Sequence, residues 1–392
     1  MSKRPCSTST DLSPAAKRQS TAHSFPVFPS HRYSGKCPEY KQPVEIQSYS
    51  IDANRRVWFD QRELKYYIEP KLSSPGPCLS RGYDRFIKRD ESVPEHLDTL
   101  LDTLTTARLN GSPDVDHVDI VTWRGIMTKI FCTPFTRNEP WELRATRYKN
   151  TIFMEEQATE QKLRQEQTMS ERQRLMSYWG YSFESMCTAT EPKGVPDPDD
   201  VPNTNVQYCV AVKTRLGRNT IAMGAEVDCI EGEKPKDGNL LRQYVELKTS
   251  RRMDTQRQKE NFERFKLLKF WAQSFLIGVP KVICGFRDDD GVLSHLETFK
   301  TLEIPRKVRH GTGAWDASAC MNFANEFLDW LKKVVTEDDP TVTYSITWNA
   351  PWREIRVSRA GHVNVFLTQR YLDGETSHDI GGPRAQQGSS SN

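Results

Sequence analysis

The sequence predicts a mixed α/β fold, in which twisted mixed β-sheets are flanked by helices within one domain over residues 41–372. Three observations lead to this expectation. Apolar residues make up 36% of the 392 residues and nine residues are tryptophan, which is enough for a packed core and excludes a wholly disordered chain. Strand-like and helix-like patterns alternate along the chain. Neither an internal repeat nor a linker divides the body of the chain.

The expected elements follow from local patterns. The segment 93–111 has apolar residues at helical spacing and ends in a glycine. The segment 206–250 contains three strand-like runs, the last two joined by the turn-rich sequence EGEKPKDGN. In chain order we expect a helix over 93–111, β-rich runs over 116–135 broken near Gly125, a polar helix around 157–178, strands over 206–216, 219–230 and 242–250, a helix near 254–277, a strand over 280–286, a helix around 314–336, and short strands including 342–349 and 362–367.

Both ends of the chain are expected to be disordered tails, over residues 1–40 and 373–392, because they are rich in Ser, Thr, Pro, Gly and Gln. The basic pairs Lys3–Arg4 and Lys17–Arg18 fit either a nuclear import signal or a solvated arm. Residues 1–36 hold six basic residues and one acidic residue, so their net charge is +5 in a chain whose total is +3. The rest of the chain therefore carries −2, which does not predict a body coated for non-specific nucleic-acid binding.

Cysteine usage and hydropathy exclude other classes. The nine cysteines are scattered without a CxxC motif or paired Cys/His spacing, so we expect neither a zinc ribbon nor a disulfide framework. Most lie in apolar runs, as Cys284 does in PKVICGF, which is typical of reduced, buried thiols. No run approaches the roughly 20 apolar residues of a membrane span, and the N-terminus lacks the apolar core of a secretory signal. We therefore expect an intracellular protein with no membrane partner.

Two strand-like segments carry charged residues where a core strand would normally have apolar ones. Glu226 and Asp228 are two residues apart in GAEVDCI, and Glu246 and Lys248 are two apart in YVELKTS. Alternate side chains of a strand point to the same face, so each pair lies together. Each segment alone also fits a solvated strand edge. Taken together, and with a long helix after the second, they indicate a shared catalytic centre.

Clustered carboxylates predict a divalent metal. They would repel one another and raise one another's pKa unless cations compensate, and hard oxygen ligands suit Mg²⁺ or Mn²⁺. Such a site serves phosphodiester or pyrophosphate hydrolysis. One ion lowers the pKa of the attacking water and a second stabilises the leaving oxygen. The Lys248 ammonium would orient the water or neutralise charge on phosphorus.

The spacing of Asp228, Glu246 and Lys248 resembles the core of the PD-(D/E)XK nuclease superfamily. The sequence also resembles a narrower group, the DXO family of RNA 5′-end decapping enzymes, which includes fungal proteins that accompany a nuclear 5′→3′ exoribonuclease. The motifs that carry this resemblance are TWRGIMTKIFCTPF (122–135), GYSFE (180–184), GAEVDC (224–229), VELKTS (245–250) and FWAQSFLIGVPKVICGFR (270–287), in the family's order.

The resemblance implies a role for each site residue. Glu184, Glu226, Asp228 and Glu246 would bind the metal ions, with the carbonyl of Leu247 as a further ligand. Glu226, Asp228, Glu246 and Lys248 would be the catalytic set. The residues implied to bind substrate are Arg124, Glu184, Lys248 and Gln273.

The residues alone leave three of these positions open. Glu184 also fits a surface acid, and Arg124 fits a structural, ion-paired arginine. Gln273 shares a helix side with Lys266 and Lys269, which excludes a core role but fits solvent as well as a site. Basic residues that flank the acidic strands and could follow an RNA backbone are Arg215, Arg218, Arg251 and Arg252. The segment 137–150 also interleaves aromatic and basic residues, but a charged strand face with aromatics opposite is the commoner outcome.

The function expected is a divalent-metal hydrolase that removes incomplete or non-standard caps, including NAD-type caps, or pyrophosphate from RNA 5′ ends. By resemblance it would act in nuclear RNA quality control and would stimulate a partner 5′→3′ exoribonuclease. Two alternatives remain open: a PD-(D/E)XK DNA nuclease, and a mainly non-catalytic partner that stabilises an exoribonuclease.

Overall fold

Two mixed β-sheets form the frame of the protein in this computed structural model, which describes residues 22–376 apart from 198 and 237. The ten-stranded sheet runs, in spatial order, β1 (His23–Pro26), β16 (Glu354–Gly361), β15 (Asp339–Trp348), β6 (Trp141–Tyr148), β7 (Thr151–Gln157), β5 (Ile120–Trp123), β10 (Asn219–Glu226), β9 (Gln207–Leu216), β2 (Val44–Ile51) and β3 (Val57–Trp58). The six-stranded sheet runs β14 (Leu293–Lys300), β13 (Lys281–Arg287), β12 (Tyr244–Arg251), β11 (Cys229–Ile230), β4 (Tyr66–Tyr67) and β8 (Thr188–Ala189).

Helices cover both sheets. The α-helices of the described residues are α1 (Asp98–Leu109), α2 (Arg124–Cys132), α3 (Glu160–Gln167), α4 (Glu171–Met186), α5 (Gln256–Asn261), α6 (Leu268–Ile277), α7 (Ile304–His310), α8 (Ala317–Val334) and α9 (Gln369–Leu372). A π-helical turn, Phe262–Leu267, joins α5 to α6. Local signals fix several ends: a capping box formed by Ser170 and Gln173 starts α4, and Gly278 ends α6 in the left-handed conformation.

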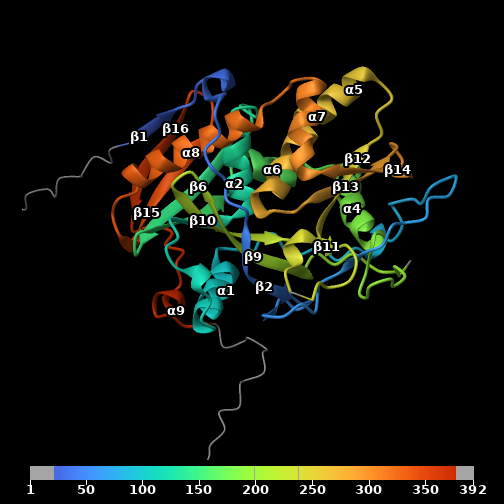
Figure 1. Cartoon of the computed structure of the whole chain (residues 1–392), viewed down its shortest axis with the longest axis horizontal. Coiled ribbons are helices and arrows are strands. Elements are labelled where there is room, and N and C mark those ends of the chain that lie inside the picture. Colours follow the sequence, from blue (N-terminus) through green and yellow to red (C-terminus); the bar gives the residue numbers. More distant parts are fainter. Residues whose placement is uncertain (1–21, 198, 237, 377–392) are drawn as a thin grey trace, which may run out of the picture.

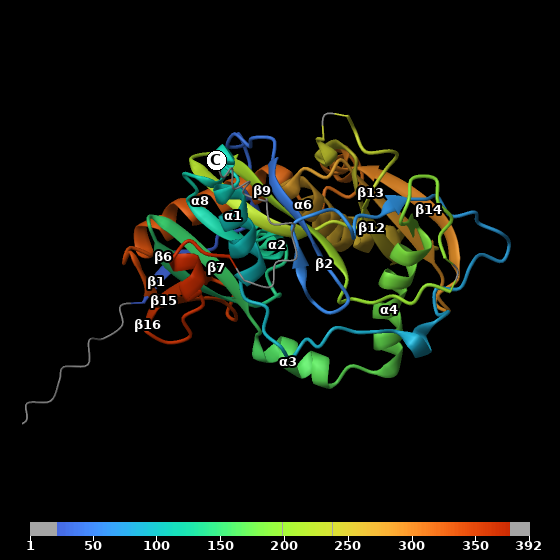
Figure 2. The ribbon, with the colours of Figure 1, turned by 90° about the horizontal axis from the view of Figure 1, so that it is seen from below.

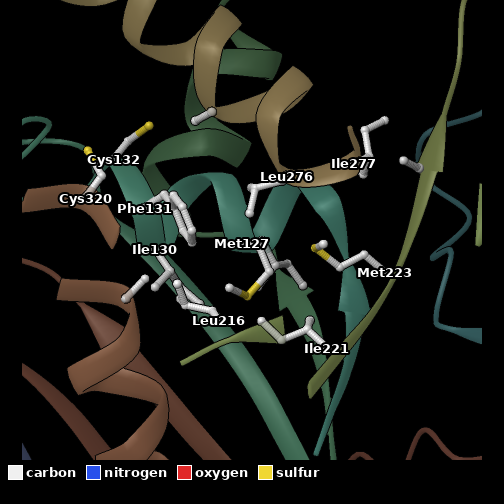
Figure 3. Close-up of a cluster of buried hydrophobic side chains, with 14 of the residues drawn as sticks. Met127, Ile130, Phe131, Cys132, Leu216, Ile221, Met223, Leu276, Ile277 and Cys320 are labelled. Carbon is white, nitrogen blue, oxygen red and sulfur yellow. The ribbon is translucent and has the colours of Figure 1, made fainter. Parts of the chain in front are cut away.

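The main core lies where α2, α6 and α8 pack over the strands (Figure 1). Met127, Ile130 and Phe131 of α2 face Ile221 and Met223 of β10 in this cluster (Figure 3). On the other face of the ten-stranded sheet, α1 covers a second cluster. The third cluster forms between α4 and the six-stranded sheet (Figure 2). The mixed α/β expectation, with twisted mixed sheets flanked by helices, is therefore confirmed.

A hydrogen-bonded group of side chains joins the two sheets. The hydroxyl of Tyr244, on β12, donates to a carboxylate oxygen of Glu45, on β2, at 2.6 Å. It also lies 3.4 Å from the hydroxyl of Tyr208, on β9. Both tyrosines are buried. We call Glu45, Tyr208 and Tyr244 the intersheet clamp, because it connects strands of different sheets.

Several expected elements need correction. Residues 124–132 form helix α2, whereas a β-rich run was expected; their apolar residues recur at helical spacing and are buried on one side. The expected strand over 219–230 is split at Val227 into β10 and β11. The polar helix is divided into α3 and α4. Residues 362–367 form no strand, and the strand lies just before them, in β16.

The expected N-terminal tail is shorter than residues 1–40. Strand β1 pairs with β16, and its Phe25 is buried against Phe323, Phe327 and Trp330 of α8. Apolar burial within an otherwise polar segment explains the difference. The two basic pairs expected as an import signal and residues 377–392 of the expected C-terminal tail lie outside the described residues. In the described part of the chain, eight cysteines are free and six of these are buried, as expected.

Candidate active site

The predicted acids converge where the two sheets meet. Glu226 is the last residue of β10, in the ten-stranded sheet. Asp228 follows after the break at Val227, and Glu246 and Lys248 lie on β12, in the six-stranded sheet. Helix α4 carries Glu184 toward the same centre. Residues distant in the sequence are thus brought to one place by the short connection between β10 and β11.

Strand alternation gives β12 one apolar and one polar face, as predicted. Val245 and Leu247 are buried against α4. Glu246 and Lys248 point to the opposite face. Glu246 is 1% exposed, an unusual position for a carboxylate, and so requires partners that compensate its charge.

Two cations hold Glu246. The Arg124 guanidinium, at the start of α2, donates to one of its oxygens at 2.9 Å, and the Lys248 ammonium lies 2.6 Å from the other. Burial opposes ionisation, but Arg124 and Lys248 outweigh it and lower the pKa of Glu246 to about 2. Burial likewise disfavours the charge on Lys248, whose pKa is nevertheless raised by Glu246 and then Asp228. This ion-paired triad is therefore charged throughout the neutral range.

Asp228 and Glu184 are in the opposite electrostatic situation. The backbone N–H of Leu247 donates to Asp228 at 2.6 Å. Burial and the nearby Glu246 carboxylate nevertheless raise the pKa of Asp228 to about 7. Burial, followed by repulsion from Asp228, raises the pKa of Glu184 well above its usual value. A cation placed between these carboxylates would relieve the repulsion.

Glu226 is exposed and is oriented by a residue that the sequence did not indicate. The side-chain amide of Gln207, on the neighbouring strand β9, donates to Glu226 at 3.0 Å. The Arg55 guanidinium in turn donates to the Gln207 carbonyl oxygen at 2.6 Å. No local motif marks Gln207, because its role arises only from the antiparallel register of β9 and β10.

Two cavities meet at Glu226. The first, of about 680 Å³, is also lined by Glu184 and Tyr181. The second, of about 990 Å³, is also lined by Trp123 and Arg144. The segment between η2 (Tyr83–Arg85) and α1 contributes Arg89 and Glu91 to both cavities and runs across the face between the sheets (Figure 2). A long substrate therefore has room on both sides of Glu226.

The remaining predicted residues lie at different distances from this centre. Leu247 is buried, and its backbone is adjacent to Asp228. Gln273 is half-buried on α6, and its side-chain amide forms no hydrogen bond with any of the described residues. Arg144 lines the second cavity and donates to Glu155 at 2.9 Å, whereas Trp141 of the same strand is buried in the core. The segment 137–150 thus contains a strand, β6, with a charged face and an aromatic core residue.

The four flanking arginines are paired with acids. Arg215 contacts Glu39 and Arg251 contacts Asp289, each at 2.6 Å. The other two pairs are Arg218 with Asp329 at 3.8 Å and Arg252 with Asp254 at 3.2 Å. These ion pairs lie at the surface and each contributes little, so a role of the four arginines in binding RNA stays a prediction.

The donor set fits a hard divalent cation. In the part of the chain that the structure describes, no three His, Cys, Asp or Glu side chains lie close enough to form a preassembled metal cage. Two of the acids, however, have raised pKa values because they share a low-dielectric space, and their oxygens suit Mg²⁺ or Mn²⁺. The residues that would hold the metal are Glu184, Glu226, Asp228, Glu246 and the carbonyl of Leu247.

This arrangement defines the class. An acid after one strand, an E-x-K sequence on the next, and flanking helices are the features of a PD-(D/E)XK nuclease, a hydrolase of phosphate linkages. A family model described as RAI1-like PD-(D/E)XK nuclease matches residues 41–372. The chain therefore belongs to the RAI1-like family of PD-(D/E)XK nucleases, and the resemblance drawn from its motifs is confirmed.

Named relatives and solved structures of this family are similar to this chain over most of its length. The human protein named "Decapping and exoribonuclease protein" is 41% identical over 340 residues, covering 86% of this chain and 85% of that protein. Candida albicans Rai1, solved with pU5 and Mn²⁺, superposes with a TM-score of 0.81 at 27% identity, over 90% of this chain and 98% of that one. Scheffersomyces stipitis Rai1, solved with (3′-NADP)⁺ and calcium, gives a TM-score of 0.78 at 28% identity, over 87% and 97% of the two chains.

No helix in the described ranges is both long and apolar enough to span a membrane.

Proposed function

We propose that this nuclease acts at RNA 5′ ends, where it hydrolyses incomplete or non-standard caps, including NAD-type caps, and releases pyrophosphate from 5′-triphosphate ends. The observation that carries the proposal is the convergence of Lys248 and four carboxylates, one of which, Glu226, lies where two cavities meet. The choice of substrate is supported by a relative that is named as a decapping protein. It is also supported by two solved relatives, one in complex with pU5 and the other with (3′-NADP)⁺.

The acidic residues of the site would bind the metal ions. Glu184, Glu226, Asp228 and Glu246 would hold two divalent ions, Mg²⁺ or Mn²⁺, together with the Leu247 carbonyl. Such ions lower the pKa of bound water and stabilise charge on the leaving oxygen.

The basic residues of the site would act on the attacking water, on the substrate and on Glu246. The Lys248 ammonium, kept protonated by Glu246, would orient the water or neutralise charge at phosphorus. Arg124 would keep Glu246 ionised, and with Gln273 it would hold the RNA 5′ end.

The test compares the wild-type protein with the double variant Glu226→Ala/Asp228→Ala on RNAs that differ only in their 5′ ends, with Mg²⁺ or Mn²⁺. We expect the variant to lose product release, whereas Glu160→Ala, exposed on α3, should retain it. Unchanged product release by the folded double variant would overturn the mechanism. The products distinguish the activities, because a released dinucleotide, pyrophosphate and a ladder of mononucleotides each indicate a different reaction. Duplex DNA as competitor tests the DNA-nuclease alternative.

We also propose that the protein works in the nucleus and stimulates a 5′→3′ exoribonuclease. The motif resemblance and the basic pairs of the N-terminal sequence support this. Co-purification from cell extract, followed by an exoribonuclease assay with and without the protein, tests it. A stimulated exoribonuclease with the Glu226→Ala/Asp228→Ala variant would show that partner and catalytic roles are separate.

A further inference from the structure

A basic surface lies outside both cavities, over helix α5, the π-helical turn and helix α7. Residues 256–267 and 304–310, which we call the basic surface, contain seven Lys or Arg residues and two Glu residues, so their net charge is +5. None of them lines either cavity. Because residues 37–392 together carry −2, the rest of that range carries −7. Positive charge is therefore concentrated on this part of an otherwise acidic body.

Most cations of the basic surface have no acidic partner. All seven are exposed. One of them, Lys307, pairs with Glu297 at 2.6 Å. For the other six, no carboxylate oxygen of the described residues lies within 4.0 Å of a charged nitrogen. The six are Arg257, Lys259, Arg264, Lys266, Arg306 and Arg309. They can therefore bind phosphates, with the release of counterions.

An exposed aromatic ring lies among these cations. Phe265 is 42% exposed on the π-helical turn, and the Arg264 guanidinium lies 5.1 Å from the centre of its ring. Phe262, three residues earlier, instead packs against Phe286 in the core. Proteins that bind single-stranded nucleic acids combine cations for the phosphates with aromatic rings on which bases stack. The basic surface has both components.

One continuous helical segment connects the basic surface with the active site. Helix α5, the π-helical turn and α6 follow one another directly, and α6 carries Gln273. At about 1.5 Å per residue, Lys259 lies about 20 Å from Gln273 along the helix axis. Helix α7 packs against the π-helical turn, so the two parts of the basic surface lie side by side (Figure 1).

Lys266 lies between the basic surface and the acids. It precedes Gln273 by about two helical turns. Although part of its side chain is exposed, protein atoms surround its ammonium group. This burial, together with repulsion from cations that include Lys248, lowers the pKa of Lys266. Lys266 is therefore placed to receive a phosphate of a chain that leaves the active site.

We propose that the basic surface binds the single-stranded RNA chain downstream of the hydrolysed 5′ linkage, with its phosphates on the lysines and arginines and a base stacked on Phe265. The inference rests on the proposed function, because it takes RNA as the substrate. An acidic protein segment is the competing ligand, but base stacking gives the exposed ring a role that an acidic segment does not. The enzyme should therefore prefer long over short RNA, and salt should weaken this preference.

The first experiment measures binding by fluorescence anisotropy. The probe is a single-stranded RNA of about 20 nucleotides, longer than a usual site of about 4–16 nucleotides, in EDTA so that no metal-dependent hydrolysis occurs. The variant Arg257→Gln/Arg264→Gln/Arg306→Gln removes three phosphate contacts. Each contact contributes about 0.7 to the slope of log K against log salt, so the slope should fall by about 2 and the affinity about 10- to 100-fold at about 0.1 M salt.

Two further variants define what the binding measures. Phe265→Ala should lower the affinity about 5- to 100-fold and leave the salt slope unchanged, because stacking releases no counterions. The matched control is Lys234→Gln/Lys236→Gln/Lys333→Gln, which removes three exposed lysines outside the basic surface and both cavities. This control should bind RNA like the wild-type protein.

The second experiment measures kcat/KM with Mg²⁺ or Mn²⁺ on two 5′-triphosphate RNAs, of about 3 and about 20 nucleotides. The wild-type protein should hydrolyse the longer RNA with the higher kcat/KM, and the triple arginine variant should lose most of that advantage. Equal losses on both RNAs would refute the proposal, because the arginines would then support the fold or the acids.

The remaining outcomes separate the inference from its rivals. If the triple arginine variant keeps the affinity and salt slope of the wild-type protein, the basic surface does not bind RNA. If it instead loses only the binding of a polyglutamate peptide, the surface binds an acidic protein segment and the proposal is overturned. If the wild-type protein hydrolyses neither RNA, the proposed function fails, whereas the anisotropy still decides whether the surface binds RNA.

Discussion

Neutralising Asp228 should stabilise the metal-free protein while it abolishes activity. Its pKa of about 7 lies above the ordinary value of 3.8, so the folded state binds a proton more readily than the unfolded state does. Stability that depends on this group is therefore lost as the pH rises from about 4 to 7. Asp228→Asn removes the charge but keeps an oxygen that can accept the Leu247 N–H.

The magnitude follows from the two pKa values. The ionisation penalty is about 4 kcal/mol at pH 8 and below about 1 kcal/mol at pH 4. Asp228 is only half-buried, and water in the cavity screens part of this penalty, so we expect a gain of about 2–4 kcal/mol at pH 8. The gain should shrink to below about 1 kcal/mol at pH 4.

The assay is urea unfolding in EDTA at pH 8 and pH 4, with Asp84→Asn, an exposed acid on η2, as the control. Added Mg²⁺ should stabilise the wild-type protein more than Asp228→Asn, because binding to the folded state adds stability. A metal-free Asp228→Asn variant that is less stable than the wild-type protein at pH 8 would refute the assigned electrostatics.

Two other variants test further parts of the structure. Lys248→Met removes the ammonium that lies 2.6 Å from Glu246 and should lower kcat about 100- to 1,000-fold. Single-turnover hydrolysis checks this, with Lys259→Met on α5 as the control. A near-normal rate would exclude Lys248 from the reaction. Phe25→Ala should lower the free energy of unfolding by about 3 kcal/mol, because its ring is buried against α8. Urea denaturation measures this loss, and an unchanged midpoint would mean that β1 does not contribute to the core.

The acids of the site were predictable because strand periodicity is a local property. Glu246 and Lys248 share a face, with Val245 and Leu247 opposite, as alternation requires. Asp228 was assigned to a strand but lies beyond its end, since the chain leaves one sheet for the other at Val227. Local patterning does not report where a strand changes sheets.

Other features could not be read from the sequence because they depend on tertiary contacts. Gln207 meets Glu226 only through the register of β9 and β10. Tyr181 becomes a cavity wall only when Phe86, distant in the chain, stacks behind it. Helix α2 was mistaken for strand because short apolar runs fit either period until packing decides.

The intersheet clamp makes the geometry of the active site depend on the angle between the two sheets. Glu226 belongs to one sheet and Glu246 to the other, so their separation changes whenever the sheets rotate against each other. A rotation of about 5° displaces a group 10 Å from the axis by about 0.9 Å, a misplacement that can reduce a rate about 100-fold. Tyr244, by bonding to Glu45, resists that rotation without touching the substrate. Substitutions at this junction should therefore lower the rate of hydrolysis more than they lower the melting temperature. The turnover number would then report how the two sheets are aligned.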